Sequence, residues 1–309
     1  MRLVTIFLFL ALLAVPAALS TGHRSVTAPA PVLAVTVDGS RIAYAVGRSA
    51  NDCNRVYVWS DGTHAVTKLG RATHCEQTST GNAIASLALA GTRALWLHYV
   101  GGNFRTWSLW TATTSKPGPL RLRSIETEAD APAPILVGRA HDDVLPYAVG
   151  RSVIAMRANG ARRYAYEAEA SVVDLAADGS RLAVATRGGI VTVLDGTGAV
   201  AQREVFTREI DVVRLSGTML VVQMGRSLDV RGPFIRRTWT LPARAQLEDV
   251  ATAKNVSQTK AVYVVGGQVR RLVLATGAQS QLGIGTMAGA DSTRVAIANG
   301  RVVTLTAIR

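Results

Sequence analysis

After its first twenty residues, the chain is a succession of short apolar runs separated by polar turn residues. Two stretches share one frame, VLAVTV-DGSR-IAYAV with its turn at Asp38–Arg41 and VVDLAA-DGSR-LAVAT with its turn at Asp178–Arg181. The runs are rich in Val, Ile, Thr and Ala, and Asp-Gly, Asn-Gly and Gly-Gly pairs separate them. This is the pattern of short strands joined by tight hairpins. We therefore expect an all-β protein with no helix after the first segment.

The hairpin unit repeats along the chain. Weaker copies of the turn occur at Ala90-Gly91-Thr92-Arg93, Ser216-Gly217-Thr218-Met219, Ser257-Gln258-Thr259-Lys260 and Asp291-Ser292-Thr293-Arg294. A hairpin unit that recurs about every 35 to 50 residues is typical of a β-propeller, in which four-stranded blades surround a central channel. We predict one domain at residues 21–309, with about seven four-stranded blades at residues 32–69, 83–122, 134–167, 170–206, 210–241, 248–282 and 286–309.

The last predicted blade has only three strands of its own. Propellers commonly complete one blade with strands from both ends of the chain, and residues 23–30 (HRSVTAPA) are placed to supply the missing strand. Proline in this segment suits an edge strand, where its missing N–H leaves no gap in the sheet. A solenoid and a split pair of sheets are the alternative arrangements.

The first segment has the features of an export signal. Arg2 provides a short positive region, residues 3–15 are unbroken apolar sequence, and Pro16 and Ala18-Leu19-Ser20 follow. We predict a signal peptide at residues 1–20 with cleavage after Ser20, and a secreted, periplasmic or cell-envelope protein with no membrane span after cleavage. The alternative is an uncleaved anchor, although the apolar run is shorter than the roughly 20 residues that a bilayer needs.

The chain has two cysteines, Cys53 and Cys75. Two cysteines in an exported chain suggest one disulfide, which would close a loop of about 22 residues and stabilise the fold by about 3 kcal/mol in the chain-entropy model. Two unpaired thiols are the alternative. Two cysteines give no support for a structural zinc site.

The formal net charge is +13, and nearly all of the positive charge is arginine. A basic exported protein could meet an anionic polymer such as cell-wall material, acidic polysaccharide or a lipid surface. The arginines are scattered through every repeat, however, which favours a solvated exterior. No clustered basic stripe with interleaved aromatic residues is present, and we expect no nucleic-acid binding.

The strongest repeats resemble a known family. DGSRIAYAVG followed by NRVYVWSDGT, and DGSRLAVATRGGIVTVLDGTG, are similar to the repeat unit of the TolB-type, WD-repeat-like propellers. The Trp-Asp dipeptide of true WD repeats is absent, with Trp59-Ser60-Asp61 its nearest equivalent, and no proline precedes the Asp-Gly pairs. The resemblance implies the propeller fold and, as the commonest role in the family, a protein-binding scaffold.

A candidate binding face follows from the predicted blades. Loops between the second and third strands and loops that lead into the next blade share one face, and the longest predicted loops, at residues 47–54, 71–82 and 123–134, fall there. Long loops without structure of their own are often functional. The candidate binding residues are Asp52, His74, Glu76, Asn103, Glu126, Glu128 and Asp130. The same loops contain Cys53 and Cys75. The alternative is that these are solvated loops with no ligand.

Catalytic and metal-binding patterns are weak. None of the five histidines forms a pair at metal-ligand spacing on one element. The segment His141-Asp142-Asp143 could offer a carboxylate-rich patch, even a cation site, but it lies where a hairpin turn is expected, and we prefer the turn. Ser152 and Ser227 lack the flanking glycines of a nucleophile elbow. We predict no metal, no cofactor and no identifiable catalytic residue.

Aromatic side chains cluster in the second predicted blade, at Trp96, Tyr99, Trp107 and Trp110. They could contact carbohydrate, but interfaces between blades bury large apolar side chains, and we prefer core packing. Our leading hypothesis is a monomeric, exported, non-enzymatic propeller that binds a protein partner. The alternatives are an extracellular propeller enzyme acting on polysaccharide, of glycosidase or lyase type, and a structural module of the envelope.

Overall fold

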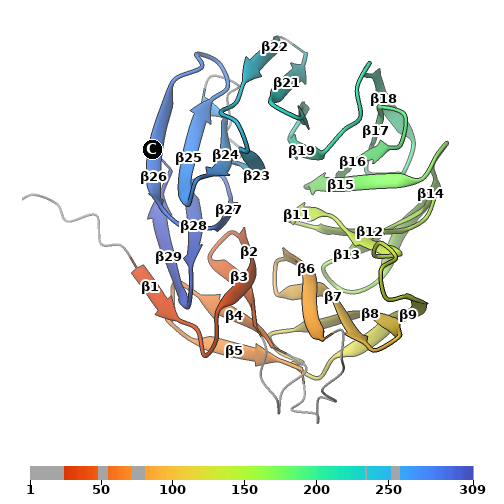
Figure 1. Ribbon diagram of the computed structural model, residues 1–309, viewed down its shortest axis with the longest axis vertical. Helices are drawn as coiled ribbons and strands as arrows, with labels where there is room; N and C mark the ends of the chain where they lie inside the picture. The colour runs from red at the N-terminus through yellow and green to blue at the C-terminus, as the bar shows by residue number, and fades with distance from the viewer. Residues whose placement is uncertain (1–23, 48–54, 71–80, 234, 252–257, 309) are drawn as a thin grey trace, which may run out of the picture.

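The computed structural model describes residues 24–47, 55–70, 81–233, 235–251 and 258–308. Within these residues the chain forms seven sheets arranged in a ring around a central axis (Figure 1). The predicted all-β propeller with about seven blades is confirmed, and hairpin turns fall at the repeated tetrapeptides that begin at Asp38, Ala90, Asp178, Ser216 and Asp291. No helix in this part of the chain is long and apolar enough to cross a membrane.

Each blade is a meander of antiparallel strands, numbered from the channel outward. Blades 1 to 3 contain β2 (Val32–Asp38), β3 (Arg41–Val46), β4 (Val56–Ser60) and β5 (Val66–Leu69); β6 (Asn82–Ala90), β7 (Arg93–Gly101), β8 (Phe104–Thr113) and β9 (Leu120–Glu128); and β10 (Ile135–Val137), β12 (Val144–Val149), β13 (Ser152–Arg157) and β14 (Arg162–Glu167). Blade 4 contains β15 (Val172–Asp178), β16 (Arg181–Thr186), β17 (Ile190–Leu194) and β18 (Val200–Val205), together with one additional strand, β11 (Arg139–His141).

The remaining blades follow the same plan. Blades 5 to 7 contain β19 (Val212–Ser216), β20 (Met219–Met224), β21 (Ser227–Gly232) and β22 (Ile235–Thr240); β23 (Gln246–Ala251), β24 (Lys260–Val265), β25 (Gln268–Val273) and β26 (Gln279–Ile284); and β27 (Met287–Ala290), β28 (Arg294–Asn299), β29 (Val302–Ala307) and β1 (Arg24–Thr27). The last blade thus takes its outer strand from the start of the described chain. There β1 pairs antiparallel with β29, with Arg24 opposite Leu305.

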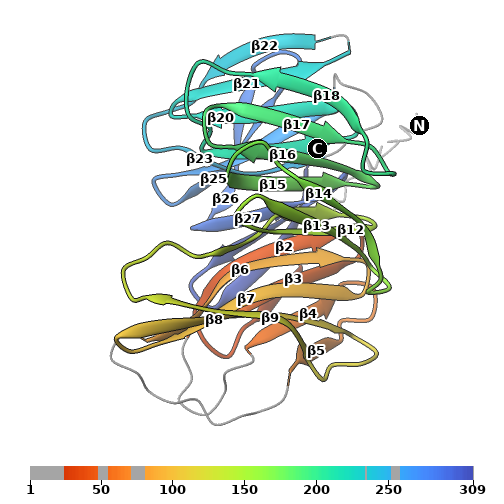
Figure 2. The same cartoon turned by 90° about the vertical axis from the view of Figure 1, so that its right-hand side faces the viewer.

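The two faces of the ring differ in what they carry. The turn face contains the turns between the first and second strands of each blade. The loop face contains the turns between the second and third strands and the connections into the next blade. Figure 2 shows the ring from the side, with β8 and β9 of blade 2 reaching past their neighbours at one edge. Blade 2 has the longest strands of the described residues, and β8 contains ten.

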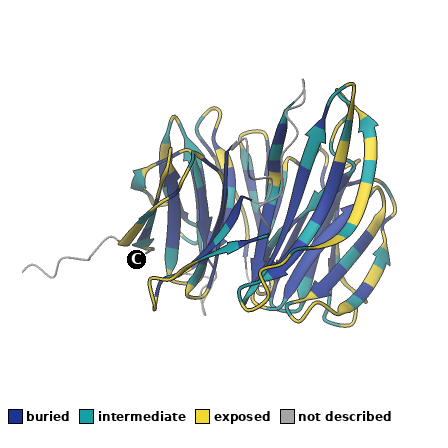
Figure 3. Ribbon diagram, turned by 90° about the horizontal axis from the view of Figure 1, so that it is seen from below, coloured by how far each residue is buried: buried dark blue, intermediate teal, exposed yellow. Residues whose placement is uncertain are grey.

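Hydrophobic packing between blades holds the ring together. Because each inner strand is covered on both sides by its neighbours, its side chains are apolar in nearly continuous runs rather than in alternation. All six residues of β20 are buried, whereas β18 on the outside alternates between exposed and half-buried positions. Trp96 of blade 2 packs against Ala43 and Val58 of blade 1 in one such interface. Figure 3 views the molecule from below, where the inner parts of the strands are mainly buried and the exposed residues lie at turns and along outer strands.

The repeated Asp-Gly-Ser-Arg turn connects neighbouring blades. The carboxylate of Asp38 accepts a hydrogen bond from the amide of Gly91 in the next blade, and that of Asp178 accepts one from Gly217 in the same way. The arginine of the turn also reaches the next blade, since Arg181 Nη1 donates to the Gly217 carbonyl at 3.0 Å. In both strong copies, the aspartate of the motif therefore makes a blade-to-blade contact.

The expected packing role of the aromatic residues of blade 2 is confirmed for two tryptophans. Trp96 and Trp107 are buried at 0% and 4% exposure. Trp110 is half-buried, and the guanidinium of Arg121 lies 5.8 Å from its ring centre. The rings of Trp96 and Trp107 therefore stabilise blade interfaces and are not free to stack on a sugar.

Candidate functional site

Five of the residues singled out from the sequence lie outside the described residues. They are Asp52, Cys53, His74, Cys75 and Glu76. The predicted disulfide and the part of the predicted binding face that they form stay predictions.

The other four predicted residues lie together at the loop-face end of blade 2. Asn103 is exposed in the turn between β7 and β8, Glu126 and Glu128 are exposed on β9, and Asp130 is exposed in the turn that follows. Strand register places Glu126 opposite Thr106 and Glu128 opposite Phe104.

The expectation that residues 123–134 form a loop is wrong for their first half, because β9 continues to Glu128. The sequence held the signal, since Ile125 and Thr127 alternate with exposed residues at the period of a half-buried strand. Ile125 packs on the core that blades 2 and 3 share, which fixes the register and turns both glutamates outward. The carboxylates are therefore held on a rigid strand rather than on a loop.

An exposed aromatic side chain lies beside these carboxylates. Phe104 is 57% exposed at the start of β8. Behind it, the rings of Tyr99 and Trp107 are 5.0 Å apart, the Arg105 guanidinium lies 5.1 Å from the Tyr99 ring centre, and Trp107 Nε1 donates to Thr127 Oγ1 at 3.0 Å. We call residues 99–107 and 125–130 the blade 2 tip. In the tip, packed aromatic rings lie behind the exposed side chain of Phe104, and exposed carboxylates lie beside it.

A second notable feature is the strand that crosses the central channel. The first strand of blade 3 breaks at Gly138: β10 pairs with β12 of its own blade, whereas β11 pairs in parallel with β15 of blade 4. A Cβ atom on Gly138 would lie 2.4 Å from Leu175 Cβ and 2.6 Å from the Leu175 carbonyl oxygen, so only glycine permits this approach. Figure 1 shows β11 pointing from blade 3 toward the centre of the ring.

Arg139, on β11, ties three distant blades to this strand. Its guanidinium donates to the carbonyls of Val35 at 2.8 Å, Glu248 at 3.1 Å and Ala288 at 3.1 Å, on blades 1, 6 and 7. Its Nε lies 3.4 Å from the buried carboxylate of Asp249. One side chain thus provides hydrogen-bond donors to backbone carbonyls of three blades that surround the channel.

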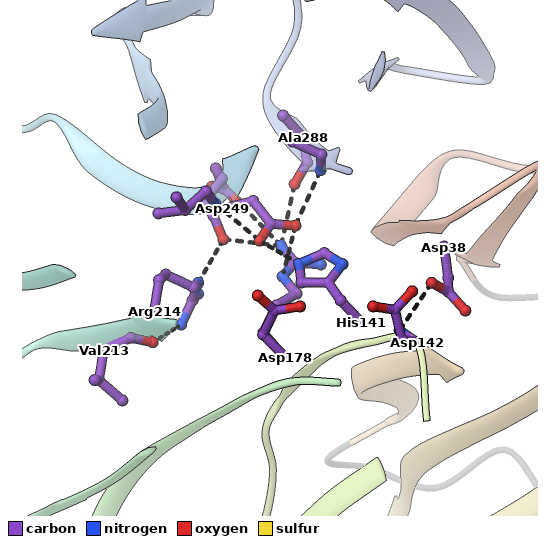
Figure 4. Close-up of polar contacts among 12 residues, drawn as sticks. Asp38, His141, Asp142, Asp178, Val213, Arg214, Asp249 and Ala288 are labelled. Carbon is purple, nitrogen blue, oxygen red and sulfur yellow. Dashed lines mark hydrogen bonds and ion pairs between the residues drawn. The ribbon is translucent and has the colours of Figure 1, made fainter. Parts of the chain in front are cut away.

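His141, at the end of β11, pairs with Asp249 (Figure 4). Burial alone lowers the pKa of His141, but the charge and hydrogen bond of Asp249 and the charge of Asp178 overcome this and raise it to about 8. Burial also opposes ionisation of Asp249, yet His141 and Arg139 hold the pKa of that carboxyl well below its usual range. At neutral pH the pair is therefore an imidazolium and a carboxylate.

A cavity of about 320 Å³ lies at the loop-face mouth of the channel, above this cluster. Arg214, Asp174 and Glu248 line it together with Arg139. Arg214 donates to Asp174 at 2.9 Å and to the Glu248 carbonyl at 2.7 Å, and burial raises the pKa of the Glu248 carboxyl. Two positive and two negative side chains face one cavity, so its electrostatic character is mixed rather than that of an anion site.

Asp142 and Asp143 form the expected turn between β11 and β12, whereas His141 is the last residue of β11. Asp142 has a φ of 68°, which a tight turn requires, and Asp143 pairs with Arg163 at 2.6 Å. In the part of the chain that the structure describes, no group of three His, Cys, Asp or Glu side chains could hold a metal ion.

Sequence reasoning did not single out Arg139, Arg214, Glu248 or Asp249. Their partners come from blades far apart in sequence, and a scattered arginine looks the same whether it lies in the channel or in solvent. Only Gly138, inside an apolar run, marked a place where one backbone approaches another closely.

Comparison with known proteins supports the fold alone. No protein-family model matches the chain, and no curated protein matches it. Among solved structures it is similar to a chain of the mitotic checkpoint complex, at 14% identity and a TM-score of 0.59 over 100% of this chain and 99% of that one. It is also similar to the WD40 β-propeller domain of Doa1, at 11% identity and 0.59 over 94% and 98%.

A third similar structure is the β-propeller domain of Cps50 (Swd1) from Myceliophteria thermophila, at 15% identity and a TM-score of 0.57 over 93% of this chain and 98% of that one. The chain therefore shares the β-propeller architecture of these solved structures. These identities are too low to carry a partner or an activity from one protein to another.

Proposed function

We propose that the protein is an exported scaffold that binds a protein partner through the blade 2 tip. The observation that carries this proposal is Phe104, which is 57% exposed on a rigid strand and lies opposite the acidic Glu128. Aromatic residues are enriched in protein interfaces relative to the rest of the surface. The WD40 architecture, which serves as a scaffold in multiprotein complexes such as the mitotic checkpoint complex, is consistent with this role.

The charge distribution indicates what kind of partner the tip suits. Glu126, Glu128 and Asp130 rim Phe104 on a chain whose net charge is +13. The tip therefore suits a partner with an apolar pocket beside basic residues. An anionic polymer would meet the arginines elsewhere on the surface and would be repelled here.

The proposed setting is outside the cytoplasm. It rests on the signal peptide that the sequence predicts at residues 1–20 and on the predicted disulfide between Cys53 and Cys75, all of which lie outside the described residues. We favour binding over polysaccharide cleavage because Phe104 is an exposed aromatic side chain, a residue type that is enriched in protein interfaces.

Site-specific photo-crosslinking tests the proposal. The chain from Thr21 onward carries p-benzoylphenylalanine in place of Phe104, or in place of Ile284 as the control, since Ile284 is 67% exposed on an outer strand of blade 6. Both variants are irradiated in envelope extract at low and at high salt. A discrete protein adduct at position 104 that survives high salt, and is absent at position 284, supports the proposal. Equal labelling at both positions contradicts it, and so do adducts that form only when the extract is irradiated at low salt.

A further inference from the structure

A small acidic pocket lies at the other mouth of the channel, on the turn face. Its volume is about 130 Å³, and its charged lining residues are Asp38, His141, Asp142, Asp178 and Asp291. They come from the first turns of blades 1, 3, 4 and 7. In Figure 4 the His141 ring lies between the carboxylates of Asp178 and Asp142, with Asp38 beyond. Four carboxylates thus converge in a protein whose overall charge is strongly positive.

The turns hold three of these carboxylates in place. Asp38 accepts from the amide of Asp142 at 2.9 Å, Asp178 accepts from the amide of Gly217, and Asp291 accepts from the amide of Arg294 at 2.9 Å. A carboxylate has about four lone-pair positions, so Asp38, which also accepts from the amide of Gly91, keeps acceptor capacity beyond these two bonds. The pocket is therefore lined by acceptors that do not have to be ordered on binding.

In its neutral form, His141 provides an independent indication that a donor belongs here. The residue is 6% exposed, its Nε2 contacts Asp249 at 2.9 Å, and its Nδ1 is buried without a hydrogen-bond partner among the described residues. When Nε2 carries the proton toward Asp249, Nδ1 is a lone-pair acceptor. A buried ring nitrogen without a partner is unfavourable, and a ligand N–H that reached it would relieve this.

We propose that this pocket binds the primary ammonium head group of an organic cation. Its three N–H donors match the surrounding acceptors: the carboxylates of Asp142, Asp178 and Asp38, and Nδ1 of His141. The volume of about 130 Å³ suits a head group with a short alkyl stem rather than a whole folded element. The site is on the opposite face from the blade 2 tip and does not depend on its function.

The proton on His141 competes with this ligand. The charged groups that face the ring are Asp38 on β2, Arg139 on β11, Asp142 in the following turn, Asp178 on β15 and Asp249 on β23. With its pKa raised to about 8, His141 is mostly an imidazolium at neutral pH, which repels the ammonium and removes the Nδ1 acceptor. Affinity should therefore rise by about tenfold between one pH unit below and one unit above this pKa, as the neutral fraction rises.

The test is a calorimetric titration of the mature protein with butylammonium, matched against butyltrimethylammonium. The two probes carry the same charge and the same chain, but the second has no N–H donor. The proposal expects saturable binding of butylammonium only, stronger at the higher pH. Equal binding of both probes, binding of neither, or binding that is independent of pH would overturn it. A peptide with a single lysine tests the source of the head group. Tighter binding of this peptide than of butylammonium indicates a lysine side chain of a protein, and weaker binding indicates a small free amine.

Asp142→Asn is the diagnostic variant. Asn tolerates the positive φ of 68° at this position, so the turn is retained while one carboxylate is lost. The dissociation constant for butylammonium should rise about threefold to fivefold, the usual effect of one partly exposed charge pair. Asp143→Asn is the matched control, because Asp143 is in the same turn but pairs with Arg163 outside the pocket. Equal weakening in both variants would place the ligand elsewhere.

Discussion

Nε2 of His141 lies 2.9 Å from Oδ1 of Asp249, although 108 residues separate the two along the chain. The contact joins β11, which has left its own blade, to β23 of blade 6. Asp249 also accepts a hydrogen bond from the amide of Ala290 at 2.9 Å. The centre of this propeller is thus a polar cluster that links blades 3, 4, 6 and 7, and its energetics can be measured.

The pH dependence of folding should report this pair. The folded-state pKa of His141, about 8, lies above its unfolded value of about 6.5. The stabilisation is therefore fully present below pH 6.5 and is lost as pH rises through 8, a loss of about 2 kcal/mol at 1.36 kcal/mol per pKa unit. Denaturant unfolding between these pH values measures it. His141→Gln should remove this slope, and a variant that keeps the full slope would assign it to other groups.

Arg139→Gln should be strongly destabilising. The change removes three hydrogen bonds to carbonyls and leaves the buried Asp249 carboxylate with one fewer cation. Breaking a buried pair of this kind costs about 3 to 5 kcal/mol in unfolding free energy. Arg236→Gln is the control, because Arg236 is 74% exposed and pairs with Glu204 at the surface, where the expected effect is below about 1 kcal/mol. Equal effects would mean that the channel cluster contributes little.

Gly138→Ala should displace β11. The added Cβ would lie 2.4 Å from Leu175 Cβ, and both neighbouring backbones are held in sheets. We expect a loss of about 2 kcal/mol or more and a lower melting temperature. Gly62→Ala serves as the comparison, since a Cβ there meets nothing within 4 Å. A Gly138→Ala protein as stable as Gly62→Ala would show that the strand can move aside without penalty.

Asp38→Ala should weaken the contact between blades 1 and 2. It leaves the Gly91 amide, and also that of Asp142, without an acceptor. Loss of such a charged acceptor costs about 1 to 3 kcal/mol. Ser40→Ala, in the same turn but exposed, should change the unfolding free energy by less than about 0.5 kcal/mol. If the two variants unfolded alike, the repeated aspartate would have some role other than joining blades.

The predicted bond between Cys53 and Cys75 can be tested without a mutation. Reducing agent should lower the melting temperature, because opening a loop of about 22 residues removes about 3 kcal/mol in the chain-entropy model. Mass spectrometry after alkylation of the native protein gives the direct readout. Two thiols that are freely alkylated, with no change in melting temperature, would rule out the bond.

The sequence was sufficient for the fold because the repeat unit is local. The alternation of apolar runs with Asp-Gly turns such as Asp178-Gly179 depends on residues within one hairpin, and seven hairpin units leave few other ways to bury their faces. The same local reasoning placed Asn103 and Asp130 on one face. It was wrong about the backbone of Glu126 and Glu128, which lie on a strand rather than in a loop because β9 pairs with an unusually long β8.

The channel could not be predicted in this way. Arg139 meets carbonyls of residues more than a hundred positions away, and nothing in the sequence around it distinguishes it from the arginines of the surface. At Gly138 the chain changes its pairing from β12 of blade 3 to β15 of blade 4. This change is a tertiary effect as well, because it depends on the two blades lying side by side.

The pairing of β1 with β29 has a consequence for how the molecule is made. Arg301 donates to the Ala28 carbonyl across 273 positions of sequence, so this seam closes only after nearly the whole chain exists. Contacts of such long range form slowly. Until then β29 and the early strand β1 are both open edges, which can recruit a strand from another copy. During folding, pairing of β1 with β29 within one molecule thus competes with pairing of either strand with a strand of another copy.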